Sequence, residues 1–427
     1  TYLIYASRLA GLKINCIYIK RSFACEMETQ QKPIMKFREF VALMAMMMSL
    51  TALSIDAMLP ALSQIGEDLG VTEPNDNQLI ISILFLGLAI GQLFYGPLSD
   101  AIGRKKAVYI GLVFFFAGCL ISIFSDNLFI MLIGRALQGF GLSGTRTISV
   151  AIIRDRFKGD KMAQVMSFVM ATFIIVPTIA PFMGQGILWI AHWSFIFWTI
   201  LGLGLILFVW FSTRQQETLK KENRIKFELR KMLLAAKEVF TTREAIGYTI
   251  AAGFISSAFV GFLNSSQQIF QIQYGLGEKF PLFFAMIALS VGTASFINGK
   301  MVVKHGMQKM VKWASIGVCL FSLIFLGVIF EFIPSPSLAL FMSYLCATVF
   351  CTGILFGNLN SLAMEPLGHI AGMGAAIVGS VSTFISVPFG VYIGLSYNGT
   401  VVPLVIGFAV FGALAMLVVL FFAKTSK

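Results

Sequence analysis

Long apolar runs separated by short polar links dominate the chain. Each run has about 20 residues, the length that an α-helix needs to cross roughly 30 Å of hydrocarbon. Six runs precede a polar, basic stretch and six follow it, so the pattern predicts an all-α polytopic membrane protein with 12 transmembrane helices in two six-helix bundles. The predicted spans are 38–60, 79–97, 106–124, 128–153, 162–186, 192–212, 245–265, 281–299, 311–331, 337–358, 370–394 and 400–423.

These spans divide the chain into five parts. They are a cytoplasmic N-terminal segment (1–36), a first bundle (37–212), a cytoplasmic amphipathic linker (213–244), a second bundle (245–423) and a cytoplasmic tail (424–427). The chain begins with Thr, and Met27 or Met35 is a plausible start, so we expect residues 1–26 to be disordered or an upstream translation artefact. We interpret the linker as a helix lying on the anionic inner leaflet, with a partner-binding helix as the alternative.

The composition excludes an ordinary soluble protein. Apolar residues make up 57% of the chain and charged residues only 12%, too few to cover the surface of a 427-residue soluble protein. The six cysteines show no metal-ligand spacing and four lie within apolar runs, so we expect packing residues and no metal site.

The positive charges indicate the orientation of the chain. Of the 32 Lys and Arg residues, all but three fall in the ends and links that share a side with the N-terminus. The exceptions are Lys279 on the opposite side and Arg135 and Arg146 inside the fourth predicted helix. Because basic residues collect on the cytoplasmic side of membrane proteins, both termini are predicted to be cytoplasmic. The net charge of +12 thus belongs to an inner membrane face, and no nucleic-acid partner is needed to explain it.

A tight polar link joins the second and third predicted helices. It carries Gly96, Asp100, Gly103 and Arg104, where the glycines allow a close turn and the two charges can pair. The two glycines recur 203 residues later, as a second copy that has valine where the first has Asp100. The link resembles the G-x-L-x-D-(R/K)-x-G-R-(R/K) signature of major facilitator superfamily transporters, which implies the major facilitator fold with two parallel six-helix repeats.

Charged groups inside predicted spans are the first functional candidates, because burying them in a membrane is costly. Asp56 lies in the first helix, four residues before Pro60, about 6–9 Å from its outer end, and Arg135 lies about 10 Å deep in the fourth helix. We expect an acid–base pair or relay at matching depth. The alternatives are an acid exposed at a helix end and an arginine that anchors neighbouring helices.

Further motifs resemble the Bcr/CflA branch of proton-driven drug exporters. They are Asp56-x-x-x-Pro60, Arg135-x-x-Gln138-Gly139, Arg154-Asp155, Ala371 to Ala376, and an antiporter-like motif with Pro177, Pro181 and Gly184, in which Ala180 replaces the usual glycine. The resemblance implies that Asp56 binds the proton and that Arg135 is its basic partner. It also implies that Gly96, Asp100, Gly103, Arg104 and Asp155 form a conformational latch on the inner face, although Ala101 replaces the usual base there.

Candidate substrate contacts are Gln92, Tyr95, Gln138 and Arg146. Arg146 follows Arg135 by eleven residues, so it lies on the same helix face about 16 Å deeper; it either favours an anionic or polar substrate or extends to the inner interface. The polar run from Asn264 to Gln271 and the group Asn358, Asn360 and Glu365 close two predicted helices, and we interpret most of these residues as solvated by loops.

No enzyme signature is present, since the three histidines are dispersed and no phosphate-binding glycine loop occurs. The sequence, together with the resemblance, therefore predicts a monomeric, proton-coupled exporter of drug-like molecules in a bacterial cytoplasmic membrane, contacting lipid and needing no cofactor and no nucleotide. One alternative is an importer or facilitator of a small polar or anionic metabolite, and the other is a transporter-like sensor that moves nothing.

Overall fold

The computed structural model describes residues 35–225, 228–333 and 335–422. The chain divides into two units after Phe40. The expectations for residues 1–26 and for the tail at 424–427 lie outside the described residues. Apart from the first residues of α2, the fold and the site described below belong to the second unit.

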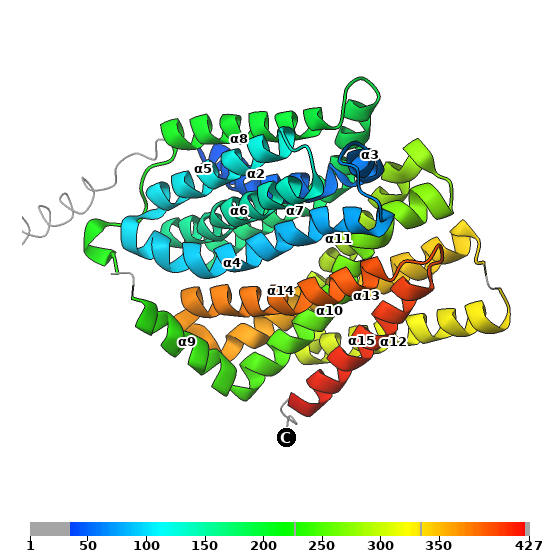
Figure 1. Ribbon diagram of the computed structural model, residues 1–427. Coiled ribbons are helices and arrows are strands. Elements are labelled where there is room, and N and C mark those ends of the chain that lie inside the picture. The colour runs from blue at the N-terminus through cyan, green and yellow to red at the C-terminus, as the bar shows by residue number, and fades with distance from the viewer. Residues whose placement is uncertain (1–34, 226–227, 334, 423–427) are drawn as a thin grey trace, which may run out of the picture. The chain divides into compact units, whose positions relative to one another are not determined.

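The first half of the chain supplies one group of long helices (Figure 1). These elements are α2 (Phe37–Asp56), η1 (Leu59–Ala61), α3 (Leu62–Asp68), η2 (Pro74–Gln78), α4 (Leu79–Ile102), α5 (Arg104–Ile123), α6 (Leu128–Arg156), α7 (Gly159–Leu188) and α8 (Ser194–Arg214). The crossing of α4 and α6 is made close by glycines, because a Cβ on Gly87 or Gly139 would overlap a carbonyl oxygen of the facing helix. Such small-residue contacts let membrane helices pack without a hydrophobic driving force.

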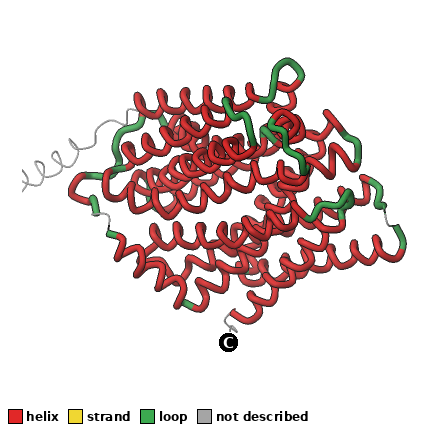
Figure 2. The backbone as a smooth tube through the Cα atoms, viewed as in Figure 1, coloured by secondary structure: helices red, strands yellow, loops and turns green. Residues whose placement is uncertain are grey.

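A linker and a second group of helices follow. The elements are η3 (Lys221–Asn223), α9 (Leu229–Thr241), α10 (Arg243–Gln267), a π-helix labelled η4 (Gln268–Gln273), η5 (Gly277–Lys279), α11 (Phe280–His305), α12 (Met307–Glu331), α13 (Leu338–Met364), η6 (Glu365–Ile370), α14 (Ala371–Leu395) and α15 (Val402–Phe422). Helix α9 is amphipathic: Leu233, Leu234 and Phe240 are exposed while Ala235 and Val239 are buried. Figure 2 shows helices joined by short loops throughout the described residues.

The prediction of twelve spanning helices is confirmed. Among the described residues, eleven continuous helical segments are long and apolar enough to cross a membrane. One of them, Leu338–Leu395, has 58 residues and contains both α13 and α14, joined by η6 with a non-helical backbone at Leu367. Counting these two helices separately gives the six-plus-six pattern that the apolar runs predicted.

The first span is longer than predicted. It was expected to end at Pro60, but that residue lies inside the short 3-10 helix η1, and α3 carries the helical path on to Asp68. Proline is tolerated at such a position because the first residues of a helix need no hydrogen-bonded N–H. Asp56 therefore lies about 18 Å from the end of the span, at 1.5 Å per residue, rather than the expected 6–9 Å.

The alternating helix directions place the links at two ends. We call one the Arg104 end, where α4 meets α5, α6 meets α7, and α13 meets α14. The other is the Gln268 end, which carries η2, α3 and the π-helix. Along the length between them α4 lies beside α14 (Figure 1), since the Ser380 hydroxyl donates to the Ala89 carbonyl at 2.8 Å and Gly379 faces Gln92.

Candidate functional site

A cavity of about 610 Å³ lies between the two groups of helices. Both halves line it, with Asp56, Gln92 and Arg146 from the first half and Asn298 and Asn360 from the second. Its aromatic lining comes from Phe85, Phe259, Phe262, Phe284 and Phe356. The size and the mixture of apolar walls with a few polar groups are typical of a site for a small molecule.

Asp56 is the last residue of α2, and its side chain borders this cavity while the residue is only 5% exposed. Helix α7 packs directly against the same turn: a Cβ at Gly184 would overlap the Ala57 carbonyl oxygen and come within 3.2 Å of Pro60. Pro177 of α7 lines the cavity as well, and Pro181 is buried. The antiporter-like motif is therefore in contact with the break that follows Asp56.

Arg135 is fully buried and is held by three hydrogen bonds. Its guanidinium donates to the Ile80 carbonyl at 3.0 Å, to the Ser54 carbonyl at 2.9 Å and to Gln138 Oε1 at 2.5 Å. It also lies 5.8 Å from the centre of the Phe197 ring. Arg135 thus ties α6 to the last turn of α2 and to the start of α4.

No ion pair joins Arg135 to Asp56 within the described residues. The guanidinium instead bonds the backbone two residues before the acid. The structure therefore brings the two residues to the same turn of α2 without the direct pair that the sequence suggested, and it gives Arg135 the geometry of the helix-anchoring alternative.

The predicted latch residues meet at the Arg104 end. The Arg104 side chain is 4% exposed and donates to Asp100 at 2.5 Å, to Asp155 at 2.9 Å and to the Ser99 hydroxyl at 2.7 Å. Gly103 adopts a positive φ of 103°, which explains the need for glycine at this turn. Gly96 faces α14, where a Cβ would lie 3.6 Å from Ala376.

The sequence analysis missed two residues that complete this charge cluster. Glu217 accepts hydrogen bonds from the backbone N–H groups of Arg104 and Lys105, at 2.9 and 3.1 Å, and Thr218 donates to Asp155 at 3.0 Å. Both follow α8, more than 100 positions after the turn that Glu217 caps. The available signal was an acid beside a basic stretch, which alone does not identify a helix cap.

Two of the four candidate substrate residues border the cavity and two do not. Gln92 and Arg146 line it. Tyr95 is fully buried and faces α6, because a Cβ added to Gly144 of α6 would lie 3.0 Å from the Tyr95 ring. Gln138 is also fully buried, and it accepts a hydrogen bond from Arg135. Both residues face the α4–α6 contact rather than the cavity.

The polar run that closes α10 was interpreted incorrectly as loop-solvated. Asn264, Ser265, Ser266, Gln267 and Gln268 are all buried, because the helix continues as a π-helix and the other half of the protein covers it. Asn358 was also expected in a solvated position, but it is buried and donates to Asn298 at 2.7 Å. Glu365, the first residue of η6, is exposed as expected.

These amides bond across the two halves at the Gln268 end. Gln78 donates to Gln268, which in turn donates to Asn75 at 2.7 Å. Asn264 donates to the Ser82 hydroxyl at 2.8 Å, and Gln267 donates to the Ser63 hydroxyl at 2.7 Å. We refer to Asn75, Gln78, Asn264, Gln267 and Gln268 as the amide cluster. The side chains of this cluster are all neutral, and they join the two halves at the Gln268 end.

Comparison with known proteins agrees with this architecture. The family model of the Major Facilitator Superfamily matches residues 43–391. The human organic anion transporter MFSD10 superposes with a TM-score of 0.68 at 16% identity, covering 92% of this chain and 100% of the other. A D-xylose-proton symporter superposes with a TM-score of 0.72 at 14% identity, covering 91% and 97%. At these identities the solved structures show the shared fold alone.

Curated relatives are bacterial proteins of similar length. The MFS-type transporter YdgK of Bacillus subtilis is 29% identical over 85% of this chain and 90% of its own. The bicyclomycin resistance protein homolog of Haemophilus influenzae is 28% identical over 86% and 91%. The chloramphenicol resistance protein CraA of Acinetobacter baumannii is 27% identical over 72% and 74%. With its twelve spanning helices, its shared central cavity and a family match over most of its length, the chain belongs to the major facilitator superfamily, a family of transporters rather than enzymes.

Proposed function

We propose that the protein is a proton-coupled exporter of drug-like molecules that works by alternating access in a bacterial inner membrane. The observation that carries this proposal is the position of Asp56, a carboxyl group at a helix break that borders a cavity lined by both halves. The names of two relatives, which refer to bicyclomycin and chloramphenicol resistance, support drug efflux as the direction.

The chemistry of Asp56 suits proton coupling. A dry, apolar surrounding favours the neutral form of a carboxyl group, and a hydrated one favours its charged form. When the cavity opens to one side and then to the other, the water around Asp56 changes. The carboxyl group can then take up a proton on one side and release it when substrate enters from the other.

Arg135 acts in this proposal as a positioning residue. Its bond to the Ser54 carbonyl holds the last turn of α2, so it controls where the Asp56 side chain points without touching it. If α6 moved relative to α2, this hydrogen bond would shift the last turn of α2 and with it the Asp56 side chain. The proposed coupling therefore runs through the backbone, from Arg135 to Ser54 and on to Asp56.

In this proposal the Gln268 end and the Arg104 end open in turn, which gives the cavity alternating access to the two sides of the membrane. The amide cluster joins the halves at the Gln268 end, so this end must open for the other state to form. The charge cluster of Arg104 lies at the opposite end, inside the first half and the linker. With basic links on the cytoplasmic side, we propose that both termini and the Arg104 end face the cytoplasm, and that the amide cluster closes the outer side.

Substitution of Asp56 tests the proposal. Asp56→Asn keeps the shape of the side chain and removes the titrating proton, so we expect active efflux of chloramphenicol from energised cells to fall more than tenfold. Asp56→Glu retains the carboxyl group and should keep part of the activity. The matched control is Asp126→Asn, an exposed acid in the link before α6, which should leave efflux unchanged. Efflux by Asp56→Asn at the wild-type rate would overturn the role of Asp56.

Import of a polar or anionic metabolite is the second candidate, and one observation favours it. Arg146 borders the cavity, and a guanidinium there attracts a carboxylate or phosphate group. This candidate predicts uptake of labelled organic anions by proteoliposomes under an inward proton gradient. It also predicts that Arg146→Gln abolishes uptake of the anion and leaves transport of neutral drugs intact.

A further inference from the structure

Helix α9, in the linker between the two halves, has one face packed on the protein and another that is exposed. It packs on α10 and α14, with Ala235 and Val239 buried. The exposed residues Arg230, Leu233, Leu234 and Lys237 follow the i, i+3, i+4, i+7 spacing of a single helix face, and Phe240 lies about one turn further on. We refer to these five residues as the exposed α9 face.

Three large apolar side chains lie on the exposed α9 face. Leu233 is 62% exposed, Leu234 is 56% exposed and Phe240 is 54% exposed. Helix α9 is not one of the spanning segments, so the hydrocarbon core of the membrane does not account for these side chains. Large apolar residues gathered on one exposed face mark a surface that binds an apolar partner.

The chain places this face at the membrane surface. Helix α9 ends at Thr241, and α10, which is long and apolar enough to span, begins at Arg243. Phe240 is therefore three residues from a spanning helix, a distance of at most about 11 Å. Arg243 also donates to the Phe421 carbonyl at 2.7 Å, so the last turn of the spanning helix α15 lies at the same level. Phe240 thus lies close to the lipid headgroups.

The exposed α9 face is also basic. Lys237 lies one turn from both Leu233 and Phe240, and Arg230 lies one turn from both Leu233 and Leu234. The five residues of this face include two bases and no acid. Helices that lie on anionic membrane surfaces combine apolar and basic side chains in this way.

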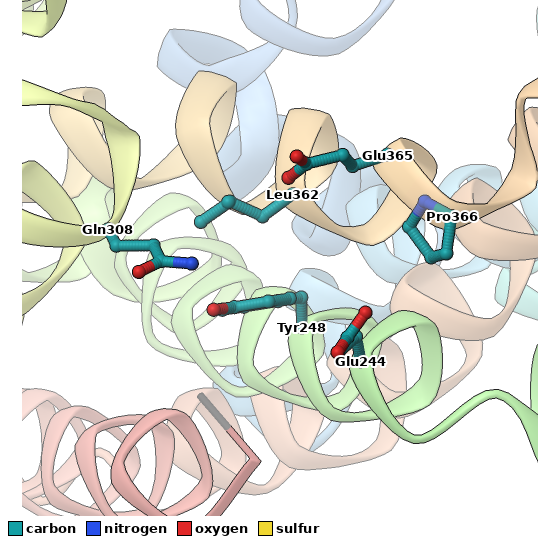
Figure 3. A pocket seen from close by; sticks show the side chains of 6 residues that line it. All are labelled: Glu244, Tyr248, Gln308, Leu362, Glu365 and Pro366. Carbon is teal, nitrogen blue, oxygen red and sulfur yellow. The ribbon is translucent and has the colours of Figure 1, made fainter. Parts of the chain in front are cut away.

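The three acids between residues 228 and 244 make their contacts elsewhere. Glu228 accepts a hydrogen bond from Lys231 at 3.2 Å, and Glu238 Oε1 lies 2.6 Å from His369 Nε2 of η6. Glu244 lines a separate cavity of about 280 Å³ beside η6, as Figure 3 shows. These carboxylates therefore do not offset the bases of the exposed α9 face.

We propose that the exposed α9 face binds the headgroup region of an anionic phospholipid surface. Leu233, Leu234 and Phe240 enter the boundary between headgroups and acyl chains, and Arg230 and Lys237 donate to phosphate oxygens. Each base close to such a surface strengthens binding roughly fivefold. A soluble phosphate would satisfy the bases but would leave the three apolar side chains in water. The site does not depend on what the protein transports.

Spin-label accessibility in lipid discs tests this proposal. Full-length protein with a genetically encoded spin label at Leu233 is placed in discs of phosphatidylcholine alone or of equal parts phosphatidylcholine and phosphatidylglycerol. In the mixed discs we expect the label to be reached better by oxygen, which partitions into lipid, than by a water-soluble nickel complex. In phosphatidylcholine discs the nickel complex should gain access. A label at Lys231, which is exposed outside this face, should favour nickel in both.

Removal of charge shows whether the two bases carry the effect. Arg230→Gln with Lys237→Gln should abolish the response of the Leu233 label to phosphatidylglycerol, because the phosphate contacts are lost. Lys309→Gln with Lys312→Gln removes the same charge from exposed positions at the start of α12 and should leave the response unchanged. Thermal unfolding of both double variants should match wild type. A Leu233 label that stays open to nickel in mixed discs, as expected for a protein-binding face, would overturn the proposal. A response that persists without Arg230 and Lys237 would overturn it as well.

Discussion

Arg135 bonds the turn of α2 that carries Asp56 and forms no ion pair with the acid within the described residues. Its three acceptors belong to three different helices, so the guanidinium fixes the break in the first span relative to α4 and α6. A lysine in its place has the same charge but a single nitrogen, which cannot reach all three acceptors. The position therefore needs the fork geometry of arginine and not only its charge.

Arg135→Lys should consequently lower both stability and transport. Loss of two bonds from a buried charged donor is expected to cost about 3–6 kcal/mol of unfolding free energy, at roughly 1.5–3 kcal/mol per bond. We expect transport to fall more than tenfold, measured in proteoliposomes alongside thermal unfolding. Arg230→Lys on exposed α9 is the matched control and should behave as wild type. Normal transport by Arg135→Lys would show that the fork is dispensable.

At the scale of helices, the contact of α7 with the break after Asp56 depends on glycine at position 184, which has no side chain. A Cβ at Gly184 would overlap the Ala57 backbone, whereas a Cβ at Gly186, two residues on, meets nothing within 4 Å. The backbone on both sides of this contact cannot yield as a flexible side chain can. The close approach of α7 to this turn thus requires glycine at position 184.

The pair Gly184→Ala and Gly186→Ala tests this contact. Gly184→Ala should push α7 away from Asp56, cost about 1–3 kcal/mol as an overpacked core does, and reduce transport strongly. Gly186→Ala should change neither the melting temperature nor the transport rate. Equal behaviour of the two variants would contradict the close packing of α7 on this turn.

The helices themselves were predictable from the sequence, and the reason is physical. A membrane demands about 20 apolar residues per span, so the spans and their number follow from the pattern. The depth of Asp56 was wrong because Pro60 suggested a helix end, while the backbone continues through η1 into α3. The apolar pattern of a helix does not tell which of its polar residues meet the other half. For this reason Asn264, Gln267 and Gln268 were interpreted as solvated by loops, although they are buried. The hydrogen bond from the Arg104 backbone N–H to Glu217 could not be predicted either, because it joins segments far apart in the sequence.

At the scale of the whole molecule, different kinds of hydrogen bond lie at the two ends. The charge cluster at the Arg104 end is ionic, whereas the amide cluster at the Gln268 end is neutral. Salt screens exposed charges and has little effect on bonds between neutral amides. The stability of the Gln268 end should therefore be nearly independent of ionic strength.

Gln268→Leu should shift the molecule toward the state in which the Gln268 end is open. The change removes the bonds to Gln78 and Asn75, worth about 1–2 kcal/mol together, which is a factor of roughly 5–30 in the ratio of the two states. Genetically encoded spin labels at Thr72 and Asn398, both exposed at this end, would report a larger fraction of long distances. Gln273→Leu, in the same π-helix, is the control. Identical distance distributions for Gln268→Leu and wild type would contradict a closing role for the cluster.

The central claim, proton-coupled export through Asp56, is tested most directly by proton movement in everted membrane vesicles. Cationic, neutral and anionic drugs are added to vesicles that contain wild type, Asp56→Asn or Asp126→Asn, and the internal pH is followed by fluorescence. We predict drug-induced proton release from vesicles with wild type and Asp126→Asn, and none from vesicles with Asp56→Asn. Drug transport without proton movement in wild type, or proton release that persists in Asp56→Asn, would contradict the account.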